Sequence, residues 1–230
     1  MSGQAPAPST KSSKFPQVWL VLVFLNTLVF AVEYWLRMRN PELAERWYRE
    51  LRLLPRDVQA GKFWQLLSFQ FLHVNLWHLV LNLMGLSFFG RPLEAARGGA
   101  ALLVLYLVTG AVGGLAHCVL GWVFPFHYGK VAVVGASAGL YGLIGSFAWA
   151  HWSERFTSSF LGGRINYTWT GQGMFILFLV VGVVCMIDTK AKVAHDAHLG
   201  GMMMGIVFSQ WFFTRLKKSG GVDKSAVGPG

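Results

Sequence analysis

The segment around which this sequence is organised reads Gly135-Ala136-Ser137-Ala138-Gly139-Leu140-Tyr141. It contains one serine between small residues, inside an otherwise apolar run. A polar group in hydrocarbon is costly unless it finds partners, and small residues at helical spacing let a second helix approach closely. Ser137 is therefore expected to meet polar groups that other segments of the chain supply.

The composition indicates a membrane protein. Of the 230 residues, 54% are hydrophobic and only 13% are charged, which is too little charge to cover a soluble domain. The formal net charge of +10 comes from basic residues scattered among segment ends. That distribution suits contact with anionic lipid headgroups and argues against a nucleic-acid-binding face. Cys118 and Cys185 both lie in apolar segments, so neither a disulfide framework nor a zinc site is expected.

Six apolar segments are predicted to cross the membrane, since a transmembrane helix needs about 20 mostly apolar residues. Their approximate bounds are 18–36, 63–90, 100–124, 131–152, 171–187 and 193–213. The fold class is thus an all-α membrane protein, with a flexible polar tail over 1–16, a six-helix transmembrane domain over 17–214 and a basic, Gly/Ser-containing tail over 215–230. A polar loop joins the fourth and fifth segments.

The stretch 37–62 mixes charged residues with aromatic and leucine residues at near-helical spacing. This pattern favours a helix that lies in the membrane interface over a plain surface loop. With six spans, both tails lie on the same side of the membrane. Basic residues divide equally between the two sides, so the positive-inside rule supports cytoplasmic tails only weakly.

Three apolar segments carry polar residues that could meet. On a helix, residues four apart lie about 40° apart in projection, so His78 and Asn82 share one face. His73 lies about 140° round the same helix from His78 and is less suited to the same spot. Counted from His198, Gly201 and Gly205 fall within about 60° of its direction and form a bare strip beneath it.

The glycine strip predicts which helices pack together. Gly135 and Gly139 bracket Ser137, so packing the two strips against each other would bring Ser137 near His198. A serine needs a neighbouring base to become a good nucleophile, and an imidazole is the usual one. Asp196 lies about 160° from His198 on the helix, so the residues predict a Ser-His dyad without a third member.

An acyl-transfer site also needs hydrogen-bond donors for the developing oxyanion. His78, Asn82 and the backbone N–H of Ser137 are the candidates. Other interpretations remain open: the serine and Tyr141 can serve packing alone, and His78 with His195 or His198 could ligate haem or line a transport path. The remaining histidines, His117, His127 and His151, lie near segment ends and are expected at the interface.

Three motifs in order resemble the rhomboid intramembrane serine proteases. Residues 73–82, HVNLWHLVLN, resemble the family's second-helix H-x-x-x-x-H-x-x-x-N. Residues 135–138, GASA, resemble its G-x-S-x motif, and Tyr141 stands where the family has a tyrosine packed on the catalytic histidine. Residues 197–205 resemble its A-H-x-x-G-x-x-x-G motif, and the similarity extends over about 18–213.

The resemblance implies a rhomboid-like bundle with an interfacial first loop. It implies Ser137 as nucleophile, His198 as general base, and His78, Asn82 and the Ser137 backbone as the oxyanion hole. Gly135, Tyr141, His73, Gly201 and Gly205 would support this site. Two departures stand out: Ala138 replaces the usual last glycine of G-x-S-G, and the family's Trp-Arg pair in the first loop appears only as Trp47-Tyr48-Arg49.

The implied activity is hydrolysis of peptide bonds in or near the transmembrane segments of other membrane proteins. No metal or cofactor is implied, and the partners would be transmembrane substrates and membrane lipids. The implied location is a cell (inner) membrane, with both termini cytoplasmic and the site open to the opposite face. A catalytically inactive rhomboid-like protein that binds membrane clients is the alternative. The substrate and the oligomeric state do not follow from the sequence.

Overall fold

The computed structural model of the chain describes residues 17–160, 165–187 and 194–218. The predicted tail 1–16 and most of the predicted tail 215–230 lie outside them. Helices and strands follow in the order α1 (Val18–Arg39), α2 (Pro41–Leu51), α3 (Pro55–Gln59), α4 (Gln65–Ser68), the 3₁₀ helix η1 (Phe69–Phe71), α5 (Leu76–Arg97), α6 (Gly99–Val123), α7 (Ser137–Ala150), β1 (Arg155–Phe160), β2 (Ile165–Thr170), α8 (Gly171–Ile187) and α9 (His195–Lys218).

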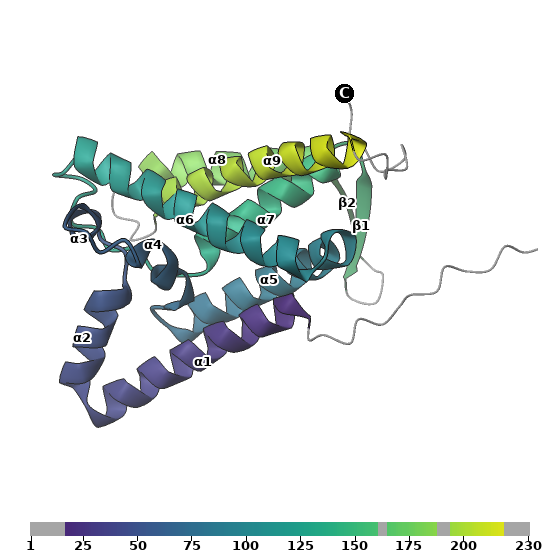
Figure 1. The fold of residues 1–230 in the computed structure, drawn as a ribbon. Coiled ribbons are helices and arrows are strands. Elements are labelled where there is room, and N and C mark those ends of the chain that lie inside the picture. The colour runs from purple at the N-terminus through teal and green to yellow at the C-terminus, as the bar shows by residue number, and fades with distance from the viewer. Residues whose placement is uncertain (1–16, 161–164, 188–193, 219–230) are drawn as a thin grey trace, which may run out of the picture.

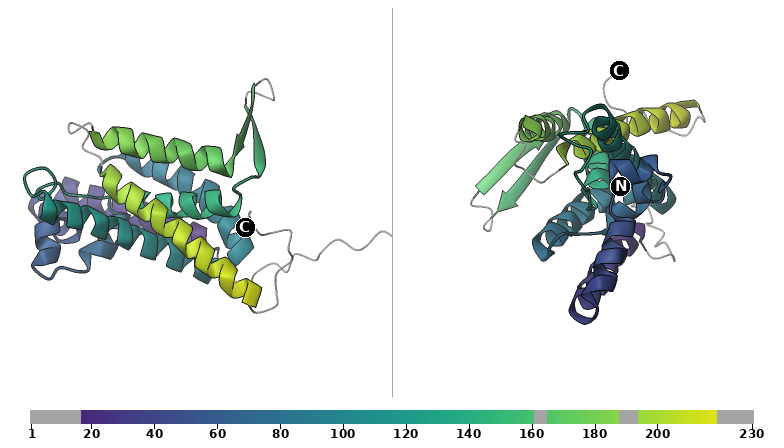
Figure 2. Two further views of the ribbon diagram at one scale, coloured as in Figure 1. Left: turned by 90° about the horizontal axis from the view of Figure 1, so that it is seen from above. Right: turned by 90° about the vertical axis from the view of Figure 1, so that its left-hand side faces the viewer.

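Helix α7 forms the centre of the bundle and is the most completely buried of the long helices. It contacts α5, α6, α8 and α9, and ten of its 14 residues are buried. Figure 1 shows α1 and α5 along one side of this core and α8 and α9 along the other, and the view from above in Figure 2 shows α9 crossing beside α8. The residues at the start of α7 therefore lie inside the bundle.

The membrane-protein prediction is supported by helix length and hydropathy. Among the described residues, α1 and α6 are long and apolar enough to cross a membrane. The helices on either side of residues 72–75 make a third candidate if this bent pair is one span. Helix α8 is apolar but shorter, and α7 has 14 residues. The described part of the chain is mostly helical with two to three candidate spans, and the six-span count stays a prediction.

The second predicted segment, 63–90, is wrong as one continuous helix. Its first part forms α4 and η1, the chain then bends by 99°, and α5 begins at Leu76 and continues to Arg97. Asn75 explains the new start, because its side chain accepts a hydrogen bond of 2.8 Å from the His78 amide, as N-cap residues do. His73 lies in the bend, so the angle on a common helix predicted for His73 and His78 does not apply.

The polar loop predicted between the fourth and fifth segments contains a β-hairpin. Strands β1 and β2 form an antiparallel hairpin in which Arg155 pairs with Thr170 and Phe160 with Ile165. The threonines explain part of this, since Thr157 and Thr168 face each other across the strands at 3.2 Å. In the range predicted for an interfacial helix, the structure has two short helices, α2 and α3; their depth in a membrane stays a prediction.

Backbone contacts at glycines hold α9 against its neighbours. A Cβ atom built on Gly201 would lie 2.2 Å from the Ala138 carbonyl oxygen, and one on Gly205 would lie 2.0 Å from the carbonyl oxygen of Gly142. Gly139 faces Tyr106 of α6 instead. The prediction that α9 packs on the serine-bearing helix through Gly201 and Gly205 is confirmed, but the facing residues are Ala138 and Gly142 and not Gly135 and Gly139.

Two sets of hydrogen bonds from charged side chains link helices at the end of the bundle away from Ser137. The Glu94 carboxylate accepts hydrogen bonds of 2.9 Å each from the backbone amides of Val18 and Trp19, the first two of α1. The Arg97 guanidinium donates to the hydroxyls of Ser146 on α7 and Ser209 on α9. These bonds join helices whose apolar faces alone would leave their relative rotation undetermined.

Candidate active site

Ser137 is the first residue of α7, and the turn before it explains why. Gly135 has φ of 126°, a conformation that side chains other than glycine's rarely adopt, and its amide donates to the Phe69 carbonyl at 2.9 Å. A Cβ atom on Gly135 would lie 2.6 Å from Cε1 of His78. The fourth segment, predicted as helical from Val131, is therefore wrong at its start, because this turn delays the helix to Ser137.

His198 lies directly against Ser137. The distance between His198 Nε2 and Ser137 Oγ is 2.7 Å, that of a good hydrogen bond. The His198 side chain is almost fully buried, whereas Ser137 is half-buried. Among the described residues, none accepts a hydrogen bond from the other ring nitrogen, Nδ1. The two residues therefore form a pair and not a triad in the part of the chain that the structure describes.

Tyr141 fixes the plane of the His198 ring. The two rings stack with their centroids 4.4 Å apart and their planes within 13° of each other. Tyr141 is one turn along α7 from Ser137, so the same helix carries both the hydroxyl and the ring that supports the imidazole. The imidazole is thus held between a hydrogen bond at one edge and an aromatic face.

His78 reaches the site, whereas Asn82 and His73 contact it indirectly. Gly135 shows how near His78 is to the serine: a Cβ atom built on Gly135 would lie 2.8 Å from His78 Nε2 and 3.6 Å from Ser137 Oγ. Asn82 is buried and donates to the His78 backbone carbonyl at 2.8 Å. The His73 ring meets the His78 ring edge to face, with centroids 5.1 Å apart, so it supports His78 from behind.

One buried pair beside the site was missed. His117 of α6 is fully buried and its Nδ1 lies 2.7 Å from the Asp196 carboxylate, while its expected depth at the membrane interface stays a prediction. Asp196 also accepts a hydrogen bond from the Ala197 amide at 2.9 Å. No signal in the sequence pairs His117 with Asp196, because the two residues lie 79 positions apart in different apolar segments.

The arrangement has the parts that acyl transfer needs. A hydroxyl hydrogen-bonds to an imidazole that can accept its proton. The backbone N–H of Ser137 belongs to the first turn of α7, where amides have no intrahelical partner. The His78 imidazole lies on the same side of the serine as Gly135. Donors and nucleophile therefore surround one small volume.

Comparison with known proteins identifies relatives that all carry the name rhomboid. Residues 60–215 match the Rhomboid domain. The chain is 28% identical to "Rhomboid protease GlpG" of Pectobacterium atrosepticum over 157 residues, covering 68% of this chain and 51% of that protein. It is 29% identical to "RHOMBOID-like protein 7" of Arabidopsis thaliana over 150 residues, covering 65% and 43%. It is 27% identical to "Putative rhomboid protease YdcA" of Bacillus subtilis over 152 residues, covering 66% and 68%. The chain thus spans about half the length of the first two relatives.

Proposed function

Because this chain belongs to the rhomboid family, we propose that it is an intramembrane serine endopeptidase with Ser137 as nucleophile and His198 as general base. The proposal rests on one observation above all, the 2.7 Å between Ser137 Oγ and His198 Nε2. Relatives named as proteases support the reaction class. The substrates would be peptide bonds in or near transmembrane segments of other proteins.

In the proposed reaction, His198 Nε2 takes the proton of the Ser137 hydroxyl as Oγ attacks the scissile carbonyl carbon. The C–N bond then breaks, and the same proton passes from His198 to the departing amine. A water molecule next attacks the ester carbonyl while His198 accepts its proton, and Ser137 is released with its hydroxyl restored. Each half-reaction uses one base that works in both directions, so no metal or cofactor is required.

The developing oxyanion would bind the Ser137 backbone N–H together with the side chains of His78 and Asn82. His78 already borders the space beside Ser137 Oγ. Asn82 donates one N–H to the His78 carbonyl within its own helix, and the second N–H of the same amide is the candidate donor to the oxyanion. Loss of either donor should cost at most about 3 kcal/mol of transition-state stabilisation.

The topology follows as part of the same proposal. Six spans would put both termini in the cytoplasm, with a cell (inner) membrane as the location and Ser137 reached by water from the opposite face. Helix α8 packs on α7 and α9 through few contacts compared with those between α7 and α9. This looser packing makes α8 the candidate gate through which a substrate helix reaches Ser137.

The decisive experiment compares purified wild-type protein with Ser137→Ala in liposomes that contain a single-span substrate with a fluorescent reporter. Turnover should vanish in Ser137→Ala and in His198→Ala but persist in His195→Ala, which matches no family motif. Retained cleavage by Ser137→Ala would refute the proposal. A fluorophosphonate should label wild-type Ser137. A folded wild-type protein that takes no label and cleaves nothing would instead be the inactive, client-binding kind of rhomboid-like protein.

A further inference from the structure

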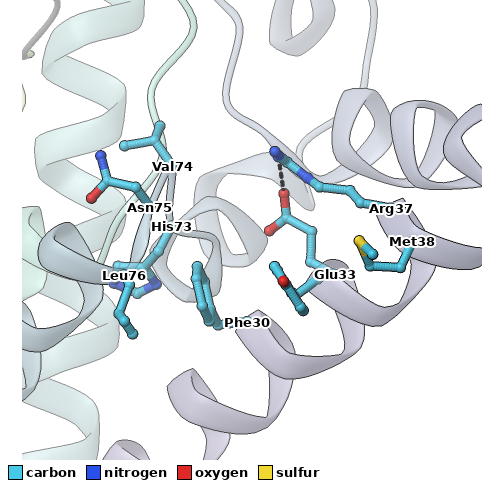
Figure 3. Close-up of a pocket in the computed structure, with 9 residues that line it drawn as sticks. Phe30, Glu33, Arg37, Met38, His73, Val74, Asn75 and Leu76 are labelled. Carbon is cyan, nitrogen blue, oxygen red and sulfur yellow. Dashed lines mark hydrogen bonds and ion pairs between the residues drawn. The ribbon is translucent and has the colours of Figure 1, made fainter.

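A pocket of about 680 Å³ opens between the end of α1 and the start of α5. It is lined by five residues of α1, Glu33 and Arg37 among them, and by residues 73–76 (Figure 3). None of Ser137, His78 and His198 lines it, although two of its lining residues, His73 and Asn75, contact His78. Its volume lies in the range of pockets that hold small ligands, and nothing in the proposed reaction uses it.

Two charges lie in this pocket at the end of an otherwise apolar helix. Glu33 has a side chain only 2% exposed, and one of its carboxylate oxygens, Oε1, accepts a hydrogen bond of 2.5 Å from Arg37. Ionisable residues within a membrane-spanning segment are costly and are usually retained for a function. The pair is therefore a candidate binding element as well as a structural one.

The Glu33–Arg37 pair is incomplete as a closed ion pair. Among the described residues, Glu33 Oε2 has no hydrogen-bond partner although it is buried. In Figure 3 this oxygen points away from Arg37, toward the part of the pocket where Phe30 and His73 lie. The Arg37 side chain is half exposed and lines the pocket, and its guanidinium also lies over the Tyr48 ring, 5.7 Å from the ring centroid. The buried Glu33 oxygen thus lacks a hydrogen-bond donor, and the half-exposed Arg37 side chain can supply donors to a bound group.

We propose that this pocket binds the headgroup of a phospholipid with a primary amine, of the phosphatidylethanolamine type. The ammonium would donate to Glu33 Oε2, and the phosphate would accept from Arg37, a good partner for phosphate oxygens. A quaternary ammonium has no N–H group and cannot satisfy Glu33, so choline lipids are disfavoured. The two opposite charges of the headgroup match the two opposite charges of the pocket.

The apolar part of the wall suits the rest of a lipid and not a soluble ligand. Met38, Val74 and Leu76 are 70%, 51% and 61% exposed, respectively, and all three line the pocket. Exposed apolar side chains beside a polar floor match the boundary between a headgroup and its acyl chains. A substrate segment is a poorer occupant, because α5 lies between α1 and the α7 helix that carries Ser137 (Figure 1).

Native mass spectrometry can test this without any cleavage assay. The protein is equilibrated with equal amounts of phosphatidylethanolamine, its N-methyl and N,N-dimethyl forms and phosphatidylcholine, all with identical acyl chains. Retention should fall with each methyl group, and phosphatidylethanolamine should be retained about tenfold over phosphatidylcholine, the size of one charge-assisted hydrogen bond. Equal retention of all four lipids by the wild-type protein would overturn the proposal.

Variants assign the preference to the pocket. Glu33→Gln should bring the preference close to one, and Arg37→Gln should lower retention of all four lipids, since each has the phosphate. Glu42→Gln, an exposed carboxylate on α2, is the matched control and should retain the wild-type preference. A folded Glu33→Gln protein that keeps the preference would overturn the proposal, as would displacement of the lipid by equimolar soluble glycerophosphoethanolamine. If Glu33→Gln fails to fold, the wild-type methylation series still decides. None of these results bears on whether Ser137 cleaves substrates.

Discussion

Gly201→Ala should reduce proteolysis strongly although Gly201 touches neither substrate nor reacting atoms. A Cβ atom at this site would lie 2.2 Å from the Ala138 carbonyl oxygen. Unstrained contacts between a carbon and a carbonyl oxygen are about 3.3 Å or longer. Helix α9 must therefore move away from α7 by about 1 Å, because the obstacle is backbone and cannot rotate aside.

This displacement acts on the proposed dyad directly. His198 lies one turn before Gly201 on α9, and Ser137 is adjacent to Ala138 on α7. The 2.7 Å between Ser137 Oγ and His198 Nε2 would lengthen to about 3.7 Å, beyond the limit of a hydrogen bond. Misplacement by about 1 Å costs about a hundredfold in rate, and the overpacking should also cost about 1–3 kcal/mol of stability.

The assay is kcat/KM for a reporter substrate in liposomes, together with the rate of fluorophosphonate labelling and the melting temperature. Gly90→Ala is the matched control, since its Cβ atom would come no closer than 3.3 Å to another atom, the Trp19 Cβ, and it should stay within about threefold of wild type. A Gly201→Ala protein with wild-type turnover would refute the reasoning from helix contact to catalysis. A slow but folded variant, with labelling reduced in proportion, would support it.

Three further outcomes follow from contacts described above. Glu94→Ala leaves the first two amides of α1 without their acceptor and should lower stability by about 1–2 kcal/mol, measured by thermal unfolding in detergent with Glu94→Gln as the milder control. Asp196→Ala removes the carboxylate bonded to Nδ1 of buried His117 and should lower stability by about 2 kcal/mol or more in the same measurement. Asp196→Asn keeps an acceptor and should lower stability less; equal losses of stability would contradict this. Tyr141→Ala removes the ring stacked on His198 and should lower kcat up to about tenfold, the size of such a ring contact; an unchanged kcat would contradict a supporting role.

The parts of the fold that follow from local properties were predictable. Helices α1, α6 and α8 lie where the apolar segments were predicted, because length and hydropathy are properties of the segment alone. The approach of His198 to Ser137 could also be predicted, because Gly201 and Gly205 lie on one face of a helix whichever helix packs against it. Their catalytic roles stay proposals.

Features that depend on tertiary contacts were not predictable. The delayed start of α7 depends on the positive φ of Gly135 and on the His78 ring beside it, and neither can be deduced from an apolar run. The bend before α5 is different, because the Asn75 cap is a bond between residues only three apart, a local signal that hydropathy alone does not register. The burial of His117 depends on a partner 79 residues away, which an isolated segment cannot reveal. In each case a single side chain or backbone angle overrides the pattern around it.

The starts of α7 and α9 differ in one way that bears on charge during the reaction. Both helices begin near the Ser137–His198 pair, and the N-terminus of a helix is equivalent to roughly half a positive charge. In α9 the acidic residue Asp196 stands in the first turn, whereas the first turn of α7 contains no acidic residue. The macrodipole of α9 thus has a negative charge beside it in the resting protein, whereas that of α7 would meet one only in the proposed reaction, when Ser137 attacks a carbonyl and the oxyanion forms.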